Sequence, residues 1–483
     1  MSFPASEPSP VDLTGTWRLE LPRSGGVVVR SYLKLSQEGS RLHGTIVINE
    51  AANLPLLHAR LEDDVGFFGI AWNADYRVQR EGPGLQVEIT YHGKRIERAV
   101  AVRVPEHEAA PPAPGLLPAR ARLSGRGLAL TPPMGWNSWN HFSDTVDDRI
   151  IRETADALVA SGLAAAGYTY VNIDDGWSGG RDAAGTIVPN SKFPDMRALA
   201  DYVHQRGLKI GLYTSPGPRT CGGYEGSHGH EERDARTFAD WGIDYLKYDV
   251  CSALRIYGRD ELPAVFQKMG QAIADCGRPM VYSINGAADG SWEWASEVGA
   301  NLWRTTDDIQ DNWRSVSAIG FGQRGLSRFA RPGHWNDPDM LEVGNGGMSP
   351  TEYRTHFSLW CLLAAPLIAG NDLRAMSAET LEILSNTEAI AINQDPLGRA
   401  AEPILTREGW EIWQRPLNDG GQAIGIFNRD DVQRASRFAW EELGRDAVPS
   451  RVRDVWQHSD VPLDPAGFSV VVPAHGVVML RLR

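Results

Sequence analysis

The sequence predicts an α/β protein in which a (β/α)8 TIM barrel follows an N-terminal all-β module and precedes a C-terminal antiparallel β-sandwich. Eight short apolar runs fill the middle of the 483-residue chain, and most of them close on a polar or acidic residue. Helical patterns separate these runs. Strand and helix alternating eight times over about 250 residues have the period of a (β/α)8 barrel.

The predicted barrel strands are residues 134–139, 168–174, 209–214, 245–249, 280–285, 301–306, 334–339 and 366–371. Their near-continuous apolar character is typical of a parallel sheet covered on both faces. Apolar spacing of three and four predicts helices at 147–160, 196–206, 231–241, 262–274, 353–364 and 377–385, with weaker patterns at 292–298 and 313–321. We expect the barrel to span 128–398, with its active site at the C-terminal ends of the strands.

The flanking regions alternate apolar and polar residues, as antiparallel strands do. In residues 1–104 the alternation covers 15–21, 31–35, 42–47 and 85–91, which predicts a small antiparallel barrel or sandwich. The Pro-rich residues 105–127 are expected to form a stiff linker. Strand patterns return at 410–415, 422–428, 468–472 and 476–482, so we expect a β-sandwich over 399–483.

The aromatic residues of the N-terminal module have two interpretations. They are Trp17, Phe67, Phe68, Trp72 and Tyr76. They would form a hydrophobic core or, alternatively, bind a polysaccharide, and we favour the core because large aromatic side chains dominate the packing of small β domains.

Composition excludes several classes of partner. The formal net charge of −13 argues against a nucleic-acid ligand, which needs clustered Lys and Arg. No run of 18 apolar residues exists, so no membrane span is expected. Residues 1–10 lack the basic and apolar regions of a secretion signal. If the protein is exported, its signal lies outside this sequence.

The four cysteines fall into two pairs. Cys276 and Cys361 lie in helical patterns and are expected to be small core residues. Cys221 and Cys251 each follow a predicted strand, in consecutive loops that could meet, either as a disulfide or as free thiols. A disulfide would favour an oxidising compartment. A secreted or periplasmic location is therefore favoured, and a cytoplasmic one stays open.

Asp249 is the first candidate for chemistry, because it closes the strand 245–249. An ionised carboxylate at the end of a buried strand is costly unless it is paired or used. A second acid, Asp308, follows the sixth strand. Two carboxylates facing each other across a barrel mouth can break an acetal, one as nucleophile and one as acid. The alternative is that such acids only cap helices, but strands two, four, six and seven all end in or beside acids.

Other residues at the strand ends suit a sugar. Lys247, two residues before Asp249, points the same way by strand alternation and would hold that acid ionised or bind a hydroxyl. Trp139 offers a flat apolar wall, and Asp174 and Asp175 offer acceptors for a pair of hydroxyls.

From Leu128 to about Gly398, and less surely to the C-terminus, the chain resembles glycoside hydrolase family 27, which contains α-galactosidases and α-N-acetylgalactosaminidases. The motifs that carry the resemblance are residues 131–139 (TPPMGWNSW), 174–177 (DDGW), 207–213 (GLKIGLY), 238–242 (FADWG), 247–249 (KYD), 303–304 with 308–309 (WR and DI), 335–340 (WNDPDM) and 391–398 (AINQDPLG). The N-terminal module is not part of that family's common core.

The resemblance implies a retaining exo-glycosidase with Asp249 as nucleophile and Asp308 as acid/base. It implies that Asp174 and Asp175 bind the axial 4-hydroxyl and the 6-hydroxyl of a galactose-like sugar. Residues implied to line the same subsite are Trp139, Tyr213, Lys247, Arg304 and Met340. The pair Cys221 and Cys251 matches a disulfide of the family. An α-galactoside oligosaccharide or polysaccharide is the implied substrate, with no cofactor and no metal.

One segment departs from the family pattern. Where α-galactosidases usually carry an acid that reads the sugar's 2-hydroxyl, residues 283–288 read Ser-Ile-Asn-Gly-Ala-Ala. Small residues there would leave room for a 2-acetamido group, or Asn285 would bind the 2-hydroxyl instead. We favour an α-galactoside over an α-N-acetylgalactosaminide. The intact Asp174 and Asp175 count against β-L-arabinopyranosidase, whose sugar lacks the 6-hydroxymethyl group.

Two other classes remain as alternatives. A metal-dependent hydrolase would need His and carboxylates at strand ends, but His228 and His230 lie in a Gly-rich segment and His334 precedes a Trp. A non-catalytic carbohydrate-binding protein would be expected to have lost one of the two acids, and both are present. The oligomeric state stays open.

Overall fold

The centre of the protein is an eight-stranded parallel sheet in the order β18-β17-β16-β15-β14-β11-β10-β19. It belongs to a computed structural model that describes residues 11–91, 93, 95–123, 127–286 and 290–483. Its strands are β10 (Met134–Asn137), β11 (Tyr170–Asn172), β14 (Lys209–Thr214), β15 (Tyr245–Asp249), β16 (Val281–Asn285), β17 (Leu302–Arg304), β18 (Trp335–Asp337) and β19 (Leu367–Ala369). A parallel bridge between Leu341 and Ala369 joins the two ends of the order, so the sheet curls round as a (β/α)8 barrel requires.

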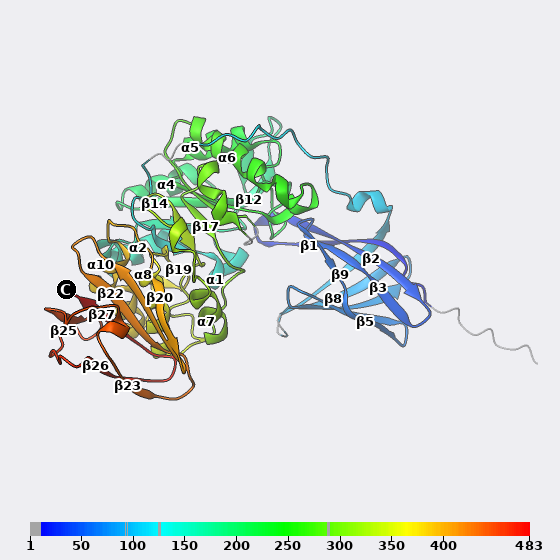
Figure 1. Cartoon of the computed structure of the whole chain (residues 1–483). Coiled ribbons are helices and arrows are strands. Elements are labelled where there is room, and N and C mark those ends of the chain that lie inside the picture. Colours follow the sequence, from blue (N-terminus) through cyan, green and yellow to red (C-terminus); the bar gives the residue numbers. More distant parts are fainter. Residues whose placement is uncertain (1–10, 92, 94, 124–126, 287–289) are drawn as a thin grey trace, which may run out of the picture.

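Helices connect these strands and cover the sheet (Figure 1). The longer ones are α2 (Asp148–Ala160), α4 (Met196–His204), α5 (Glu231–Trp241), α6 (Leu262–Asp275), α7 (Trp313–Phe321), α8 (Pro350–Leu362), α9 (Ala378–Leu384) and α10 (Thr387–Asn393). Several begin where a short polar side chain accepts a hydrogen bond from the first turn, as Asp147 does from Ile150 N–H and Ser349 from Glu352 N–H. Shorter helices are α1 (Trp139–Phe142) and α3 (Leu163–Ala166).

The weak helix predicted at 292–298 is wrong in type. Two 3-10 turns, η6 (Ser291–Glu293) and η7 (Ala295–Val298), occupy the connection. Gly290 and Gly299, both with left-handed backbone, bound it, and the non-helical backbone of Trp294 separates the two turns, so no continuous α-helix forms. The other 3-10 turns around the sheet are η3 (Ser143–Thr145), η4 (Cys251–Arg255), η5 (Arg259–Glu261), η8 (Ser327–Phe329) and η9 (Leu373–Ala375).

Most of the strands are shorter than predicted at their C-terminal ends. Trp139 begins α1, and Asp174 and Asp175 follow β11 rather than close it. A small hairpin that the sequence did not predict, β12 (Ser178–Arg181) with β13 (Ile187–Pro189), then comes before α4. Asp174 and Asp175 therefore lie on a loop just beyond the sheet. Their backbone groups are available to the site, because they take no part in the hydrogen bonds between strands.

The N-terminal module is one nine-stranded antiparallel sheet in the order β4-β3-β2-β1-β9-β8-β7-β6-β5. Its strands are β1 (Gly15–Pro22), β2 (Val28–Glu38), β3 (Arg41–Ile48), β4 (Ala52–Pro55), β5 (Leu57–Glu62), β6 (Val65–Ile70), β7 (Ala74–Glu81), β8 (Gly84–Tyr91) and β9 (Arg95–Val104), with η1 (Ser24–Gly26) and η2 (Glu106–Ala109) beside them. Of the two predicted alternatives, a small barrel is built from one continuous sheet and a sandwich from two, so the single sheet fits the barrel better. The aromatic core is confirmed for Trp17, Phe68 and Tyr76, but Trp72 is 40% exposed.

The Pro-rich linker is bound along the barrel, not suspended between domains. Gly115 N–H donates to the Tyr257 hydroxyl at 2.9 Å. The side chain of Gln267, on α6, exchanges hydrogen bonds with the backbone of Ala119 and Ala121. The prediction of a stiff linker did not include these contacts, because composition alone does not reveal what a segment packs against.

The C-terminal region contains a six-stranded antiparallel sheet, β20-β21-β22-β27-β24-β25, and a two-stranded sheet, β23-β26. The strands are β20 (Glu402–Arg407), β21 (Trp410–Pro416), β22 (Gln422–Asn428), β23 (Arg434–Phe438), β24 (Val452–Asp454), β25 (Ser459–Asp460), β26 (Phe468–Val472) and β27 (Val477–Leu482), with η10 (Glu441–Leu443) between β23 and β24. The buried Arg415 donates to Cys361 O on α8 at 2.9 Å, which ties this sheet to the barrel. No helix in the described part of the chain is long and apolar enough to cross a membrane.

Candidate active site

Asp249 is the last residue of β15, at the C-terminal edge of the curled sheet. Its Oδ2 accepts a hydrogen bond from the Tyr213 hydroxyl at 3.1 Å, and its Oδ1 accepts one from Val250 N–H at 2.7 Å. Burial raises the pKa of Asp249 to about 6, against the opposing charge of Lys247. This carboxylate is therefore ionised at neutral pH and can act as a nucleophile.

Asp308 lies beyond β17 and is paired with the last residue of that strand. The buried Arg304 donates from its Nη2 to Asp308 Oδ1 at 3.0 Å and forms an ion pair with Asp339 Oδ2 at 3.1 Å. Partial enclosure by the neighbouring loops acts to raise the pKa of Asp308. Its side chain is nevertheless 83% exposed, and the charges of Arg304 and Lys247, which lower the pKa, outweigh the effect of enclosure. The pKa of Asp308 is held below its ordinary value, so the free protein carries this group ionised.

The Arg304 guanidinium also has an unused donor. Its Nε is buried and has no hydrogen-bond partner among the described residues. A buried donor without a partner costs free energy unless a ligand or water satisfies it. This donor can therefore bind a hydroxyl of a ligand.

Asp174 joins three elements of the sheet. Its Oδ2 accepts hydrogen bonds from Lys247 Nζ at 2.8 Å and from Asn137 Nδ2 at 2.7 Å. Its backbone N–H donates to Ser138 Oγ at 3.0 Å. Lys247 was expected to serve Asp249 or a hydroxyl. It pairs directly with Asp174, and its charge also lowers the pKa of Asp249.

Asp175 is buried and faces the loop between β14 and α5. Its Oδ2 accepts from Gly222 N–H at 2.7 Å, and its Oδ1 from Gly176 N–H at 2.8 Å. Burial raises the pKa of Asp175 to about 7, although hydrogen bonds from Gly222 and Thr220 favour the ionised form. The carboxylate is thus held by backbone donors and keeps lone pairs for a ligand.

The other predicted substrate-binding residues lie around the same edge. Half-buried Trp139 lies two residues beyond β10, and buried Met340 lies three residues beyond β18. Asn285 is the neighbour of Asp249 across the β15–β16 ladder. The expected opening beside the sugar's C2 falls on Ala287 and Ala288, which lie outside the described residues.

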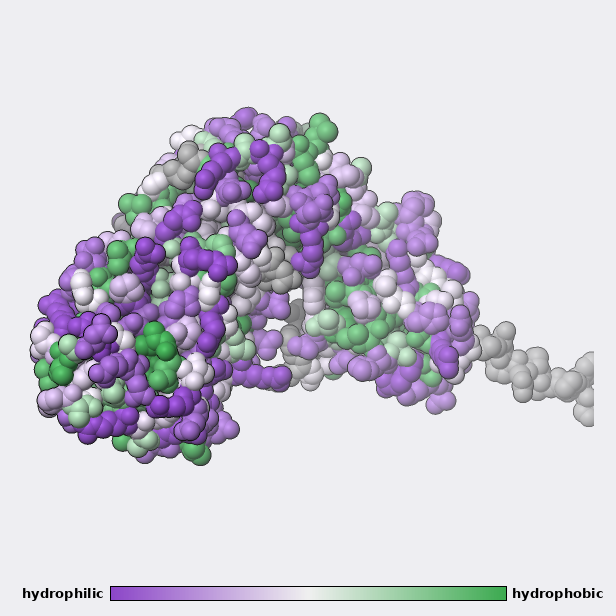
Figure 2. Space-filling model, viewed as in Figure 1, coloured by the Kyte–Doolittle hydropathy of each residue, from purple (hydrophilic) through white to green (hydrophobic). Residues whose placement is uncertain are grey.

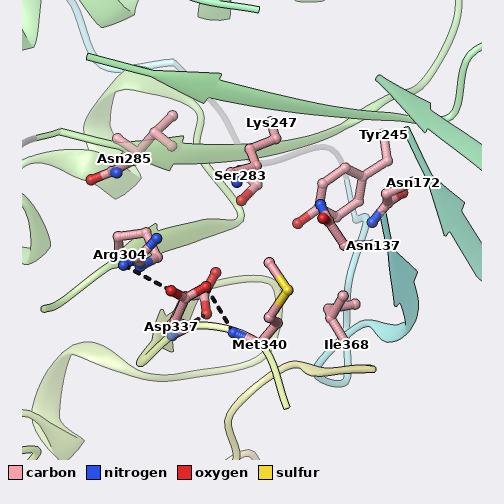
Figure 3. Close-up of a pocket in the computed structure, with 12 residues that line it drawn as sticks. Asn137, Asn172, Tyr245, Lys247, Ser283, Asn285, Arg304, Asp337, Met340 and Ile368 are labelled. Carbon is pink, nitrogen blue, oxygen red and sulfur yellow. Dashed lines mark hydrogen bonds and ion pairs between the residues drawn. The ribbon is translucent and has the colours of Figure 1, made fainter. Parts of the chain in front are cut away.

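Figure 3 shows residues that line a cavity in this region, among them Lys247, Asn285, Arg304, Asp337 and Met340. The cavity has a volume of about 30 Å³. That volume holds about one or two water molecules, not a sugar ring. The cavity adjoins the strand-end edge, because its lining includes Lys247, two residues before Asp249, and Arg304, which pairs with Asp308.

Two residues contribute to the site in ways that the sequence-based prediction did not include: Asn137 was given no role, and Asp339 was only one of the acids at the end of strand seven. Asn137 binds Asp174, and Asp339 binds Arg304 and accepts from Ile309 N–H at 2.9 Å. Asp339 has φ +79°, a left-handed backbone that is rare outside glycine and often marks a functional site. The acidic Asp337-Pro-Asp339 run was a visible signal, but the pairing with Arg304 depends on the fold.

The cysteine predictions can also be placed. A disulfide joins Cys221 and Cys251, and Cys361 is buried, whereas Cys276 is only partly buried at the end of α6. The Asp249 carboxylate lies within 4.8 Å of both disulfide sulfurs. Disulfide sulfurs are not thiolates, so this cluster lacks the ligands of a zinc site.

Comparisons with known proteins agree with this geometry. The family model described as α-galactosidase A matches residues 131–395, and the model of the α-galactosidase C-terminal β-sandwich domain matches 407–482. An α-galactosidase of Cyamopsis tetragonoloba is 46% identical over 75% of this chain and 89% of its own. The α-galactosidase A of Cellvibrio japonicus is 47% identical over 74% and 92%, and an α-N-acetylgalactosaminidase of Gallus gallus is 40% identical over 74% and 94%.

Solved structures extend the likeness. The α-galactosidase I of Mortierella vinacea is 37% identical, with a TM-score of 0.70 over 74% of this chain and 98% of its own. A structure from Bacteroides fragilis is 33% identical, with a TM-score of 0.72 over 97% of this chain and 95% of its own, so it also matches the N-terminal module. Because the first family model matches more than half of the sequence, the chain belongs to glycoside hydrolase family 27, the family of α-galactosidases and α-N-acetylgalactosaminidases.

Proposed function

We propose that the protein is a retaining exo-glycosidase that hydrolyses terminal α-linked galactose residues by double displacement. The observation that carries the proposal is the pair Asp249 and Asp308, at the end of β15 and just beyond β17, since the charges of Lys247 and Arg304 act to lower the pKa of both. The named α-galactosidases at 46% and 47% identity support the glycone and the linkage.

In the first step Asp249 attacks the anomeric carbon, and the bond to the aglycone oxygen breaks. Asp308 donates the proton that this oxygen needs, and a β-linked glycosyl ester remains on Asp249. In the second step Asp308, now ionised, takes a proton from water, which attacks the anomeric carbon from the face opposite Asp249. The bond from that carbon to the Asp249 oxygen breaks, and the α-configuration is restored. Asp308 is ionised in the free protein, so substrate must displace Arg304 from it and exclude solvent before it can hold its proton.

The sugar is held by groups that surround the two acids. Asp174 and Asp175 accept from the 4- and 6-hydroxyls, Lys247 donates beside them, and Arg304 Nε donates to the 2-hydroxyl. Trp139, Tyr213 and Met340 supply the apolar walls, with Asn285 next to C2. An α-N-acetylgalactosaminide is the second candidate, because Asn285 and Gly286 stand where an acid is usual and the Gallus gallus relative carries that name.

We also infer that the curled sheet closes as a (β/α)8 barrel over 128–398. The N-terminal module then covers 1–104, the linker 105–127 and the β-sandwich 399–483. A secreted or periplasmic location fits the disulfide Cys221–Cys251, since disulfides persist in oxidising compartments.

The function is tested on a panel of 4-nitrophenyl α- and β-glycosides, with proton NMR of the first sugar released. We expect α-galactoside to be the best substrate, ahead of its 2-acetamido analogue, and α-galactose to appear first. A tenfold preference for the analogue, about 1.4 kcal/mol in transition-state binding, would reverse the glycone assignment. First release of the β-anomer would contradict the double displacement.

The pH dependence of kcat/KM tests the ionisation of Asp249. The pKa of Asp249 is raised to about 6, so its nucleophilic form is present above that pH and is lost as pH falls through it. Lys247→Met removes a charge that lowers this pKa, so the acidic limb should move up by about one pH unit. Asp337 also has a pKa raised to about 6, but the main influences on the pKa of Asp249 come from other groups, so Asp337→Asn should leave the limb in place. If the acidic limb moves in Asp337→Asn and stays in place in Lys247→Met, it does not report the ionisation of Asp249.

A further inference from the structure

Two turns of the N-terminal module contact loops at the strand-end edge of the barrel (Figure 1). In the β1–β2 turn, Ser24 Oγ donates to Asp144 O at 2.7 Å and accepts from Lys192 Nζ at 3.1 Å. Gly25 O accepts from Ser191 N–H at 3.4 Å. This turn therefore touches the loops that follow β10 and β13.

The β3–β4 turn contacts the two loops that the disulfide joins. Asn49 Nδ2 donates to Cys221 O at 3.0 Å, and Glu50 forms an ion pair with Arg219 at 3.2 Å. Arg255, in η4, donates to Glu50 O at 2.5 Å and to Ala109 O at 2.7 Å. The module thus contacts Cys221 itself and, through Arg255, the 3-10 turn η4 that begins at Cys251.

Two glycines show how closely the surfaces fit. A Cβ on Gly25 would lie 2.6 Å from the Asn190 side chain, and a Cβ on Gly223 would overlap Val29. Both glycines have positive φ, +82° and +86°. At these distances the surfaces of the module and the barrel cannot slide past each other. Figure 2 shows that the module meets the barrel along one side and leaves an open space next to the contact.

Loop 219–223, which the module contacts, leads directly to the candidate active site. Gly222, between the residues held by the module, donates to Asp175 Oδ2 at 2.7 Å. Cys251 Sγ lies 3.1 Å from the Tyr213 hydroxyl, which donates to Asp249. A shift of loop 219–223 would therefore move a donor of Asp175, and the disulfide would transmit it towards the nucleophile.

We propose that the N-terminal module is a fixed positioning element of the active site, which holds loop 219–223 and through it orients Asp175 towards the 4- and 6-hydroxyls of the sugar. The inference rests on the proposed α-galactosidase function. It makes the module a contributor to glycone specificity and not a polysaccharide-binding domain on a tether. Asn49 and Glu50 are the positioning residues, since neither contacts the acids directly.

Matched glycine variants separate this contact from backbone strain. Gly25→Ala and Gly223→Ala place a methyl against the other surface, whereas Gly26→Ala and Gly229→Ala impose similar strain, at φ +79° and +76°, with nothing within 4 Å. All four are assayed on 4-nitrophenyl α-galactoside and on its 6-deoxy analogue. A displacement of about 1 Å can cost about a hundredfold in rate, so we expect a loss of about tenfold or more in kcat/KM on the galactoside for the first pair only.

The ratio of the two substrates identifies the cause. If Asp175 is misplaced, preference for the 6-hydroxylated sugar should fall in Gly25→Ala and Gly223→Ala, because the hydroxyl loses its partner. Val29→Ala should partly restore Gly223→Ala, since the methyl added at 223 would overlap the Val29 side chain. Asn49→Ala, which creates no clash, should change the ratio in the same direction.

Three results would overturn the proposal: equal losses in both glycine pairs, an unchanged substrate ratio, or no rescue by Val29→Ala. Thermal unfolding of each variant shows whether a loss reflects unfolded protein. A parent protein without activity on α-galactosides would contradict the proposed function instead, which keeps the two failures distinct.

Discussion

Asp249→Ala is expected to abolish turnover while leaving the fold intact. The side chain ends a strand at the edge of the sheet, and within the described part of the chain its carboxylate accepts hydrogen bonds from Tyr213 and from its own neighbour Val250, so the truncation removes few structural contacts. Loss of a covalent nucleophile costs on the order of 10⁴-fold or more in kcat. The isosteric Asp249→Asn should be as inactive, and its unfolding temperature should match the parent's.

Azide gives this prediction a chemical signature. In Asp249→Ala a small anion can enter the vacated space and attack the anomeric carbon from the nucleophile's face. The bond to the aglycone breaks, Asp308 protonates the departing oxygen, and β-galactosyl azide accumulates. NMR identifies the anomer. Residual activity within about tenfold of the parent, with no azide product, would remove Asp249 from the nucleophile's role.

The strand-end acids could be predicted from the sequence because their signal is local. Asp249 closes a five-residue buried run, and the period of such runs predicts a sheet whose C-terminal ends converge. The start of α2 was similarly local, since Asp147 caps its own first turn, but α8 begins three residues before its predicted start, at the turn that Ser349 caps. These features need only neighbours along the chain.

Features that depend on distant pairs could not be predicted. Lys247 is 73 residues from Asp174, and nothing in either segment indicates that they pair. Asn49 and Cys221 are 172 residues apart, and their contact depends on two turns of a module that composition describes only as β-rich. The 3-10 connection before β17 and the left-handed Asp339 likewise follow from how the chain is packed, which overrides local propensity.

Asp308→Ala is expected to reduce kcat/KM according to the leaving group. An alkyl or sugar aglycone needs the proton that Asp308 supplies, so its kcat/KM should fall by about 10²- to 10⁴-fold. A dinitrophenyl aglycone leaves without that help and should lose far less. Asp307→Ala is the matched control, since Asp307 is the adjacent exposed acid and its removal leaves the Arg304 pair in place.

The second step separates Asp308 from Asp249. Without Asp308 no base activates water, so the glycosyl ester persists and kcat falls even for a dinitrophenyl substrate. Azide needs no base and attacks that ester from the opposite face, so Asp308→Ala should yield α-galactosyl azide where Asp249→Ala yields the β-anomer. Equal losses for aryl and alkyl substrates, or the β-anomer from both variants, would show that Asp308 is not the acid/base. The two azide products together assign both roles, because each anomer requires attack on a different face of the same carbon.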